Sequence, residues 1–123
     1  MSDTRYQLEM ISGLPVVTGP ADIDVTNADQ LRTALLEAAV RGHATVVVDL
    51  TLTSFCDSAG LGVLVRAHKR ALAEGGEVRL VIPPGGAVSR IFTLTSLYRF
   101  IPHFDSLPDA LAQTSPGSQD RAG

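Results

Sequence analysis

A serine lies between a carboxylate and two glycines in the segment Asp57-Ser58-Ala59-Gly60-Leu61-Gly62. The segment follows a short β-branched run, Thr45 to Leu50, and precedes apolar residues at helical spacing that end before Gly75-Gly76. Ser58 is therefore expected at or beside the N-terminus of a helix. Free backbone N–H groups and the positive end of the helix dipole stabilise an anion there, so these residue types suit a reversible phosphoacceptor.

The two glycines decide between two interpretations of Ser58. Serine is a favoured helix N-cap, and on residue type alone capping is its commoner role. Gly60 and Gly62 each cost about 1 kcal/mol of helix propensity relative to alanine, a penalty that capping does not require. Bare backbone there would let another protein approach Ser58 closely. Asp57 would stabilise the helix start and, beside a phosphate, would add to an anionic patch.

Three stretches of the chain resemble the bacterial anti-sigma factor antagonists, a family built on the STAS domain. They are Val46 to Leu50, Phe55 to Leu64 and Ala67 to Ala71. The resemblance runs over most of the chain and maps the family's phosphoacceptor serine onto Ser58. Many members carry a second serine next, where this chain has Ala59, so the main acceptor alone is retained.

A second resemblance lies at Thr18 to Thr26, where the family usually has Gly-Glu-Leu/Ile-Asp before a helix. The acidic pair is retained as Asp22 and Asp24, and the resemblance places Asp24 near Ser58. Without it, both are ordinary turn carboxylates, and the run lacks the Asp-x-Asp-x-Asp-Gly spacing of a calcium loop. The expected partner-binding residues are Asp22, Asp24, Thr26, Asp57, Ala59, Gly60, Leu61, Gly62 and Arg66.

Hydrophobic patterning predicts strands at 6–11, 14–18, 45–50, 78–82 and 101–104, with a hairpin turn at Ser12-Gly13. Helices are predicted from Thr26 or Asn27 to Gly42, with Asp29 or Gln30 completing a capping box, and from Ser58, near Val88 and near Ser106. The Ser58 helix is expected to bury Leu61, Leu64, Val65, His68, Ala71 and Leu72. The fold class is α/β: a STAS-type mixed β-sheet with an N-terminal antiparallel hairpin and about four helices. Residues 1–114 are expected to form a single STAS domain, and 115–123 a disordered C-terminal tail.

Composition narrows the class of partner. The 123 residues are 45% hydrophobic and carry a formal net charge of −3, which gives no electrostatic footprint for nucleic acid or anionic membranes. No apolar run approaches the roughly 20 residues that span a bilayer, so we expect a cytoplasmic protein without direct membrane insertion. Cys56 is the sole cysteine and is expected to be a small buried hydrophobe.

Each catalytic, receiver-domain or metal-binding interpretation requires a residue or a motif that this sequence lacks. Ser58 lacks the preceding glycine of a Gly-x-Ser-x-Gly nucleophile elbow. A phospho-aspartate receiver domain would use Asp49 at its strand end together with a lysine at the end of a late strand. Lys69 is the sole lysine of this chain, and it lies in a predicted helix. The histidines His43, His68 and His103 lack metal-ligand spacing. The chain has no glycine-rich phosphate loop, so no cofactor is expected and another protein must supply the ATP site.

The expected function is that of an anti-sigma factor antagonist in bacterial stress response. Its unphosphorylated form would bind and sequester an anti-sigma factor by partner switching, and phosphorylation on Ser58 would abolish binding. The resemblance implies that the anti-sigma factor is a histidine-kinase-like serine kinase and that a separate serine phosphatase resets the switch. The alternative is a STAS regulatory subunit of a lipid or anion transporter. Neighbouring genes would discriminate between the two.

Overall fold

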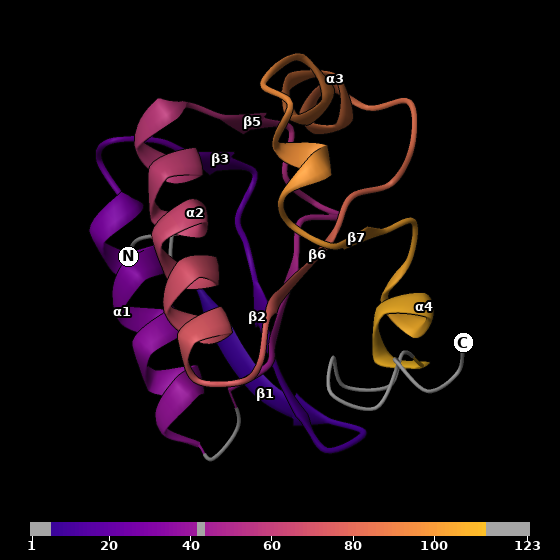
Figure 1. The fold of residues 1–123 in the computed structure, drawn as a ribbon. Helices are drawn as coiled ribbons and strands as arrows, with labels where there is room; N and C mark the ends of the chain where they lie inside the picture. Colours follow the sequence, from indigo (N-terminus) through magenta and orange to yellow (C-terminus); the bar gives the residue numbers. More distant parts are fainter. Residues whose placement is uncertain (1–5, 42–43, 113–123) are drawn as a thin grey trace.

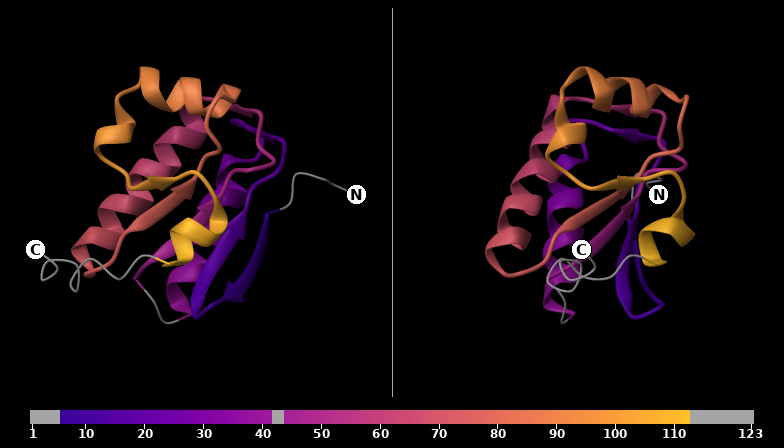
Figure 2. Two further views of the ribbon diagram at one scale, coloured as in Figure 1. Left: turned by 90° about the vertical axis from the view of Figure 1, so that its right-hand side faces the viewer. Right: turned by 45° about the vertical axis from the view of Figure 1, so that its right-hand side comes forward.

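The computed structural model describes residues 6–41 and 44–112, and its centre is a five-stranded sheet. Helices α1 and α2 lie side by side on one face of the sheet, and the short α4 covers part of the other (Figures 1 and 2). The strand order is β1-β2-β4-β6-β7; the first pair is antiparallel and the others are parallel. The strands are β1 (Gln7–Ile11), β2 (Leu14–Thr18), β4 (Val46–Asp49), β6 (Val78–Val81) and β7 (His103–Phe104).

The opening hairpin is confirmed at the predicted turn. Ser12 and Gly13 have φ values of 52° and 83°, and Ile11 pairs with Leu14. Two residues with positive φ match the twist of the flanking strands, which is why Asn, Asp and Gly are frequent there. The hairpin makes β1 an edge strand and places β2 next to the central β4.

Four α-helices follow within residues 6–41 and 44–112, which confirms the predicted α/β class. They are α1 (Ala28–Val40), α2 (Ser58–Ala73), α3 (Ala87–Leu94) and α4 (Leu107–Ala112), and a 3₁₀ turn at Leu97–Arg99 follows α3. The predicted stop at Gly42 and the predicted tail from 115 to 123 lie outside the described residues.

The core forms two layers because successive strand residues point to opposite faces. Val17, Val48 and Leu80 pack in the cluster beneath α1 and α2. Val16, Val47 and Val81 pack on the other face with Ala110 of α4. Burial on both faces explains the continuous valine run of β4.

The buried stripe of α2 differs from the predicted one. Its buried residues are Gly60, Val63, Leu64, His68 and Ala71, whereas Leu61 and Val65 are half-buried and Leu72 is 49% exposed. The predicted burial of Leu72 is wrong. The hydrophobic periodicity counts leucine as a buried residue and ignores glycine. It therefore did not predict that Gly60 faces the interior.

A second, two-stranded sheet was not predicted. The strand β3 (Asp22–Ile23) pairs in parallel with β5 (Phe55–Cys56), and Ile23 lies opposite Cys56. Two residues per strand are too few to give a detectable period. This pairing brings the loop before α1 to the start of α2, at the upper end of the molecule in Figure 1.

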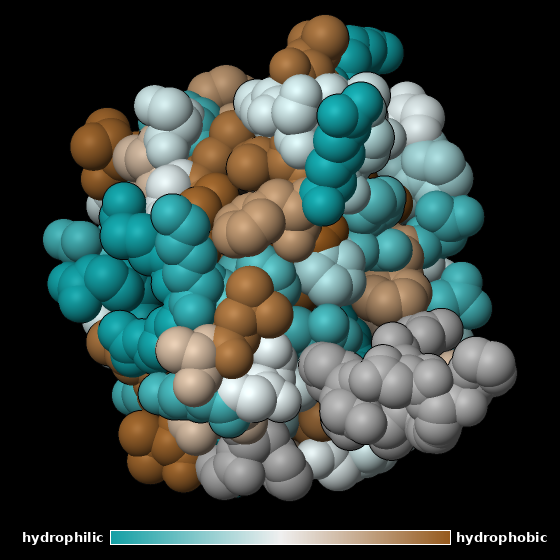
Figure 3. Space-filling view, viewed as in Figure 1, coloured by the Kyte–Doolittle hydropathy of each residue, from teal (hydrophilic) through white to brown (hydrophobic). Residues whose placement is uncertain are grey.

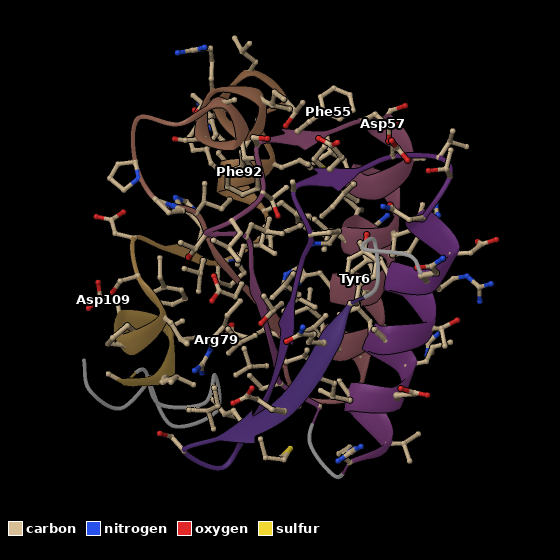
Figure 4. All side chains as sticks on the ribbon, turned by 180° about the vertical axis from the view of Figure 1, so that it is seen from behind. Tyr6, Phe55, Asp57, Arg79, Phe92 and Asp109 are labelled. Carbon is tan, nitrogen blue, oxygen red and sulfur yellow. The ribbon has the colours of Figure 1, made fainter. Side chains whose placement is uncertain are left out.

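A buried arginine joins α4 to the sheet. Arg79 on β6 is 1% exposed, and its Nε donates to Glu77 Oε2 at 2.8 Å. Its Nη1 donates to the carbonyl oxygen of Ala110 at 2.9 Å, and Figure 4 shows its side chain directed toward α4. A buried guanidinium is tolerated only when paired and hydrogen-bonded, so α4 is an integral part of the domain.

A buried histidine joins α2 to β6. His68 is 2% exposed, its Nδ1 accepts from the backbone N–H of Val78 at 3.1 Å, and Phe100 packs edge-on at 5.0 Å. Burial lowers the pKa of His68 below its ordinary value of 6.5, although nearby Glu77 opposes the shift. The ring is therefore held as a neutral acceptor.

This burial predicts a loss of stability in mild acid. Below pH 6.5 the unfolded chain binds a proton at His68 that the folded chain does not, so the free energy of unfolding declines as the pH falls toward the folded pKa. Urea unfolding between pH 7.5 and 5.5 should show this decline, and His68→Gln should weaken it. An identical pH dependence in the variant would contradict the assignment.

Candidate phosphorylation and partner-binding site

The side chain of Asp57 caps α2, so the hydroxyl of Ser58 is not needed as a cap. Asp57 Oδ1 accepts hydrogen bonds from the backbone N–H groups of Ala59 at 2.9 Å and Gly60 at 3.1 Å. Ser58 is the first helical residue and is exposed. Within residues 6–41 and 44–112, no hydrogen bond engages its hydroxyl. Capping, the alternative role for Ser58, is therefore performed by its neighbour.

The same carboxylate fixes the loop before α1. Asp57 Oδ2 accepts from the N–H of Val25 at 3.2 Å, and the N–H of Asp57 donates to the carbonyl of Ile23 at 3.0 Å. The loop containing Asp24 thus lies against the residue next to Ser58, as the resemblance implied. Asp57 is visible with Phe55 at the upper end of Figure 4.

The Asp24 loop is a rigid turn with a persistent negative charge. Asp24 Oδ1 accepts hydrogen bonds from the hydroxyl of Thr26 and from its backbone N–H, the latter at 2.9 Å. These two bonds lower the pKa of Asp24, because they favour the ionised form. Asp22, two residues earlier on β3, is exposed.

A buried asparagine supports this turn, and sequence reasoning missed its role. Asn27 is 2% exposed; its Oδ1 accepts from the N–H of Asp24 at 3.0 Å and from the hydroxyl of Tyr6 at 3.1 Å. Its Nδ2 donates to the carbonyl of Asp22 at 2.8 Å. Asn27 does occupy the N-cap position of α1, but its side chain makes no cap hydrogen bond, so the predicted capping box is wrong. A single asparagine in a turn-rich segment carries no signal of burial.

The two glycines of α2 have different environments. A Cβ on Gly60 would lie 2.6 Å from Ile23 Cγ2 and 2.8 Å from Cys56 Sγ, so Gly60 is bare because α2 packs against the two-stranded sheet. This replaces the expectation that Gly60 is bare for a partner's approach. The nearest atom to a Cβ on Gly62 is Nη1 of Arg66 at 3.4 Å. The Arg66 guanidinium therefore lies over the Gly62 backbone.

The remaining predicted residues divide between core and surface. Ala59 and Leu61 are half-buried and pack against the core, whereas Thr26 and Arg66 are exposed. Cys56 is 2% exposed, and burial raises the pKa of its thiol to about 12, which confirms it as a buried hydrophobe.

Two exposed apolar side chains beside Ser58 were also missed. Val25 is 74% exposed and Phe55 is 44% exposed, and both are linked to Asp57 through the loop and β5. Figure 3 shows hydrophobic side chains gathered over the β5 region at the upper end of the molecule. Apolar side chains held at the surface by hydrogen-bonded backbone are typical of protein contact sites. Their exposure depends on the two-stranded sheet, which the sequence pattern did not reveal.

Metal and membrane interpretations receive no support from the described ranges. No group of histidine, cysteine or carboxylate side chains in these ranges is arranged to hold a metal ion. None of the described helices has the length and apolar character needed to cross a bilayer.

The glycine environments predict opposite effects of alanine on stability. Gly60→Ala should lower the free energy of unfolding by about 1–3 kcal/mol, because the methyl group overlaps Ile23 and Cys56. Gly62→Ala should raise it by up to ~1 kcal/mol, because the Arg66 side chain can move and helix propensity improves. Denaturant titrations of both variants measure this contrast. Equal effects of the two substitutions would be inconsistent with the packing described.

Comparisons with known proteins identify relatives of this chain. An anti-sigma F factor antagonist of Paenibacillus polymyxa is 29% identical over 112 residues, which cover 89% of this chain and 93% of that protein. The crystal structure of an anti-sigma factor antagonist from Mycobacterium paratuberculosis matches with a TM-score of 0.77 and 28% identity, over 86% of this chain and 89% of the other.

A third relative shares the fold. The Bacillus cell fate determinant SpoIIAA, solved in its phosphorylated form, matches with a TM-score of 0.59 and 21% identity, over 96% of this chain and 99% of its own. The family model of the STAS domain matches residues 5–110. This match spans both sheets and all but the end of α4, and the chain therefore belongs to the STAS domain family.

Proposed function

We propose that the protein is an anti-sigma factor antagonist whose unphosphorylated form binds and sequesters an anti-sigma factor, and that phosphorylation on Ser58 abolishes this binding. The relatives with the antagonist name, at 28% and 29% identity, support the role. The observation that carries the proposal is the position of Ser58, an exposed first residue of α2 whose hydroxyl is spared from capping by Asp57.

The proposed contact area, here called the Ser58 surface, combines three kinds of group. Val25 and Phe55 supply exposed apolar anchors, and Asp24 and Asp57 supply carboxylates whose hydrogen bonds fix them in place. Asp22, Thr26, Ala59, Leu61, Gly62 and Arg66 complete the surface. Gly60 contributes through packing, since it is buried beneath the helix start.

A phosphate on Ser58 would change this surface by charge. It adds roughly −1.5 to −2 charge beside Asp57 and Asp24, while the helix dipole accommodates the anion without unfolding. The N–H groups of Ala59 and Gly60 already bond Asp57, so the phosphate must find other donors.

Arg66 is a suitable donor for that phosphate. Ser58, Gly62 and Arg66 succeed one another at intervals of four, which places them on one face of α2. Helical side chains lean toward the helix N-terminus, and the Arg66 guanidinium already lies over Gly62, one turn from Ser58. Pairing with the phosphate would make Arg66 unavailable to a partner. The phosphate itself would add negative charge to the surface that contains the apolar anchors Val25 and Phe55.

In this proposal the protein is a binding partner in the cytoplasm, not an enzyme. The anti-sigma factor is the ATP-dependent serine kinase, and a serine phosphatase restores the unmodified form. A pull-down with unmodified protein from its own cells should capture a histidine-kinase-like anti-sigma factor. Capture of a transporter instead would favour the alternative role as a transporter's regulatory subunit.

We predict that Ser58 is the sole acceptor and that its phosphate blocks binding. Incubation with the cognate kinase and ATP should add one phosphate, located on Ser58 by peptide mass mapping, and Ser58→Ala should take up none. Ser54→Ala, which removes another exposed serine near α2, is the matched control and should be phosphorylated normally. Phosphate on Ser58→Ala, or unchanged partner affinity after phosphorylation, would refute the proposal.

We further predict that phosphorylation acts locally. Amide NMR spectra of the two forms should differ chiefly at residues 56–62, with a smaller change at Arg66, because the helix start already accommodates an anion. Arg66→Gln should remove the change at position 66 and leave the others. Shifts spread through the five-stranded sheet or α1 would show that a refolding mechanism operates instead.

A further inference from the structure

A pocket between α1 and α2 shares Arg66 with the Ser58 surface and otherwise lies outside it. Its volume is about 160 Å³, and it sits above the first residues of β4 and β6, toward the opposite end of the sheet from Ser58. Figure 1 shows the two helices side by side along this face. The pocket's interior is apolar, formed by Leu35, Val46, Val63, Ala67, Ala71 and Val78.

The mouth of the pocket carries excess positive charge. Arg32, Arg66 and Arg70 line it together with a single carboxylate, Glu74. The whole chain has a formal net charge of −3, so this cluster reverses the sign of the molecule locally. Figure 3 shows hydrophilic side chains gathered over the middle of these helices.

These arginines are available to a ligand. The ion pair of Arg32 with Asp29 spans 3.8 Å between side chains that are 54% and 94% exposed, which makes it weak. Among the described residues, neither Arg66 nor Arg70 forms a salt bridge. Guanidinium groups bind carboxylates through paired, charge-assisted hydrogen bonds, so the mouth favours that group over a neutral or cationic one.

We infer that this pocket binds a small carboxylate with an apolar tail of about six carbons, the tail entering between the helices and the carboxylate meeting the arginines. An apolar cavity of about 150 Å³ holds a benzene-sized group and stays dry when empty. A volume of 160 Å³ therefore suits a six-carbon tail and is too small for a nucleotide. The inference does not depend on the proposed function, although Arg66 belongs to both sites.

Calorimetric titration of the full chain with butanoate and hexanoate tests the inference. Each added methylene should tighten binding about fourfold, since burying a methylene contributes roughly 0.8 kcal/mol. Pentylamine, which has the same five-carbon tail as hexanoate and the opposite charge, should bind at least tenfold more weakly than hexanoate. Absence of saturable hexanoate binding, or equal binding of pentylamine, would overturn the inference.

Variants locate the binding within the molecule. Arg70→Gln should weaken hexanoate binding about tenfold, whereas Lys69→Gln, which removes the adjacent exposed charge outside the pocket, should leave it unchanged. Ala67→Leu should fill the pocket and abolish binding, and a thermal melt establishes that the variant is folded. If Ala67→Leu does not fold, amide NMR of the parent protein decides: shifts on hexanoate addition must centre on residues 63–71, 35–39 and 44–46. Equal weakening by Arg70→Gln and Lys69→Gln, or NMR shifts elsewhere, would overturn the assignment.

Discussion

The carboxylate of Asp57 is the interaction on which the Ser58 surface depends. One of its oxygens caps α2, and the other holds the loop before α1 through the N–H of Val25. A cap of this kind contributes only about 0.5–2 kcal/mol, a modest fraction of a domain's stability. Its structural effect is larger, because it sets the direction of α2, the position of the Asp24 loop and the freedom of the Ser58 hydroxyl at once.

Long elements of this fold could be predicted from the sequence because each repeats a pattern. Val46, Val47 and Val48 mark a strand buried on both faces, and Ser12-Gly13 marks a two-residue turn. The hexapeptide Asp57 to Gly62 could be located by its residue types and by its resemblance to a known family. What these features share is that their chemistry is local in the sequence.

The supports of the site could not be predicted, because their partners are remote in the sequence. Asn27 is recognisable as structural only from its bonds to Tyr6 and Asp22, and Gly60 only from the side chain of Ile23. The pairing of β3 with β5 joins residues that are 33 positions apart, with two residues on each side. Neither propensity nor periodicity reports such contacts, so Val25 and Phe55 emerged as surface anchors only in three dimensions.

The bond from Arg79 to Ala110 has a consequence for synthesis of the chain. Arg79 lies on the third strand of the parallel part of the sheet, yet its Nη1 partner is contributed by the last described helix. A nascent chain still held in the ribosome up to residue 110 would have to bury this guanidinium without that acceptor, a penalty of about 1–3 kcal/mol. The sheet therefore gains its full stability only when α4 is present, which ties the last described helix to the folding of the rest of the domain.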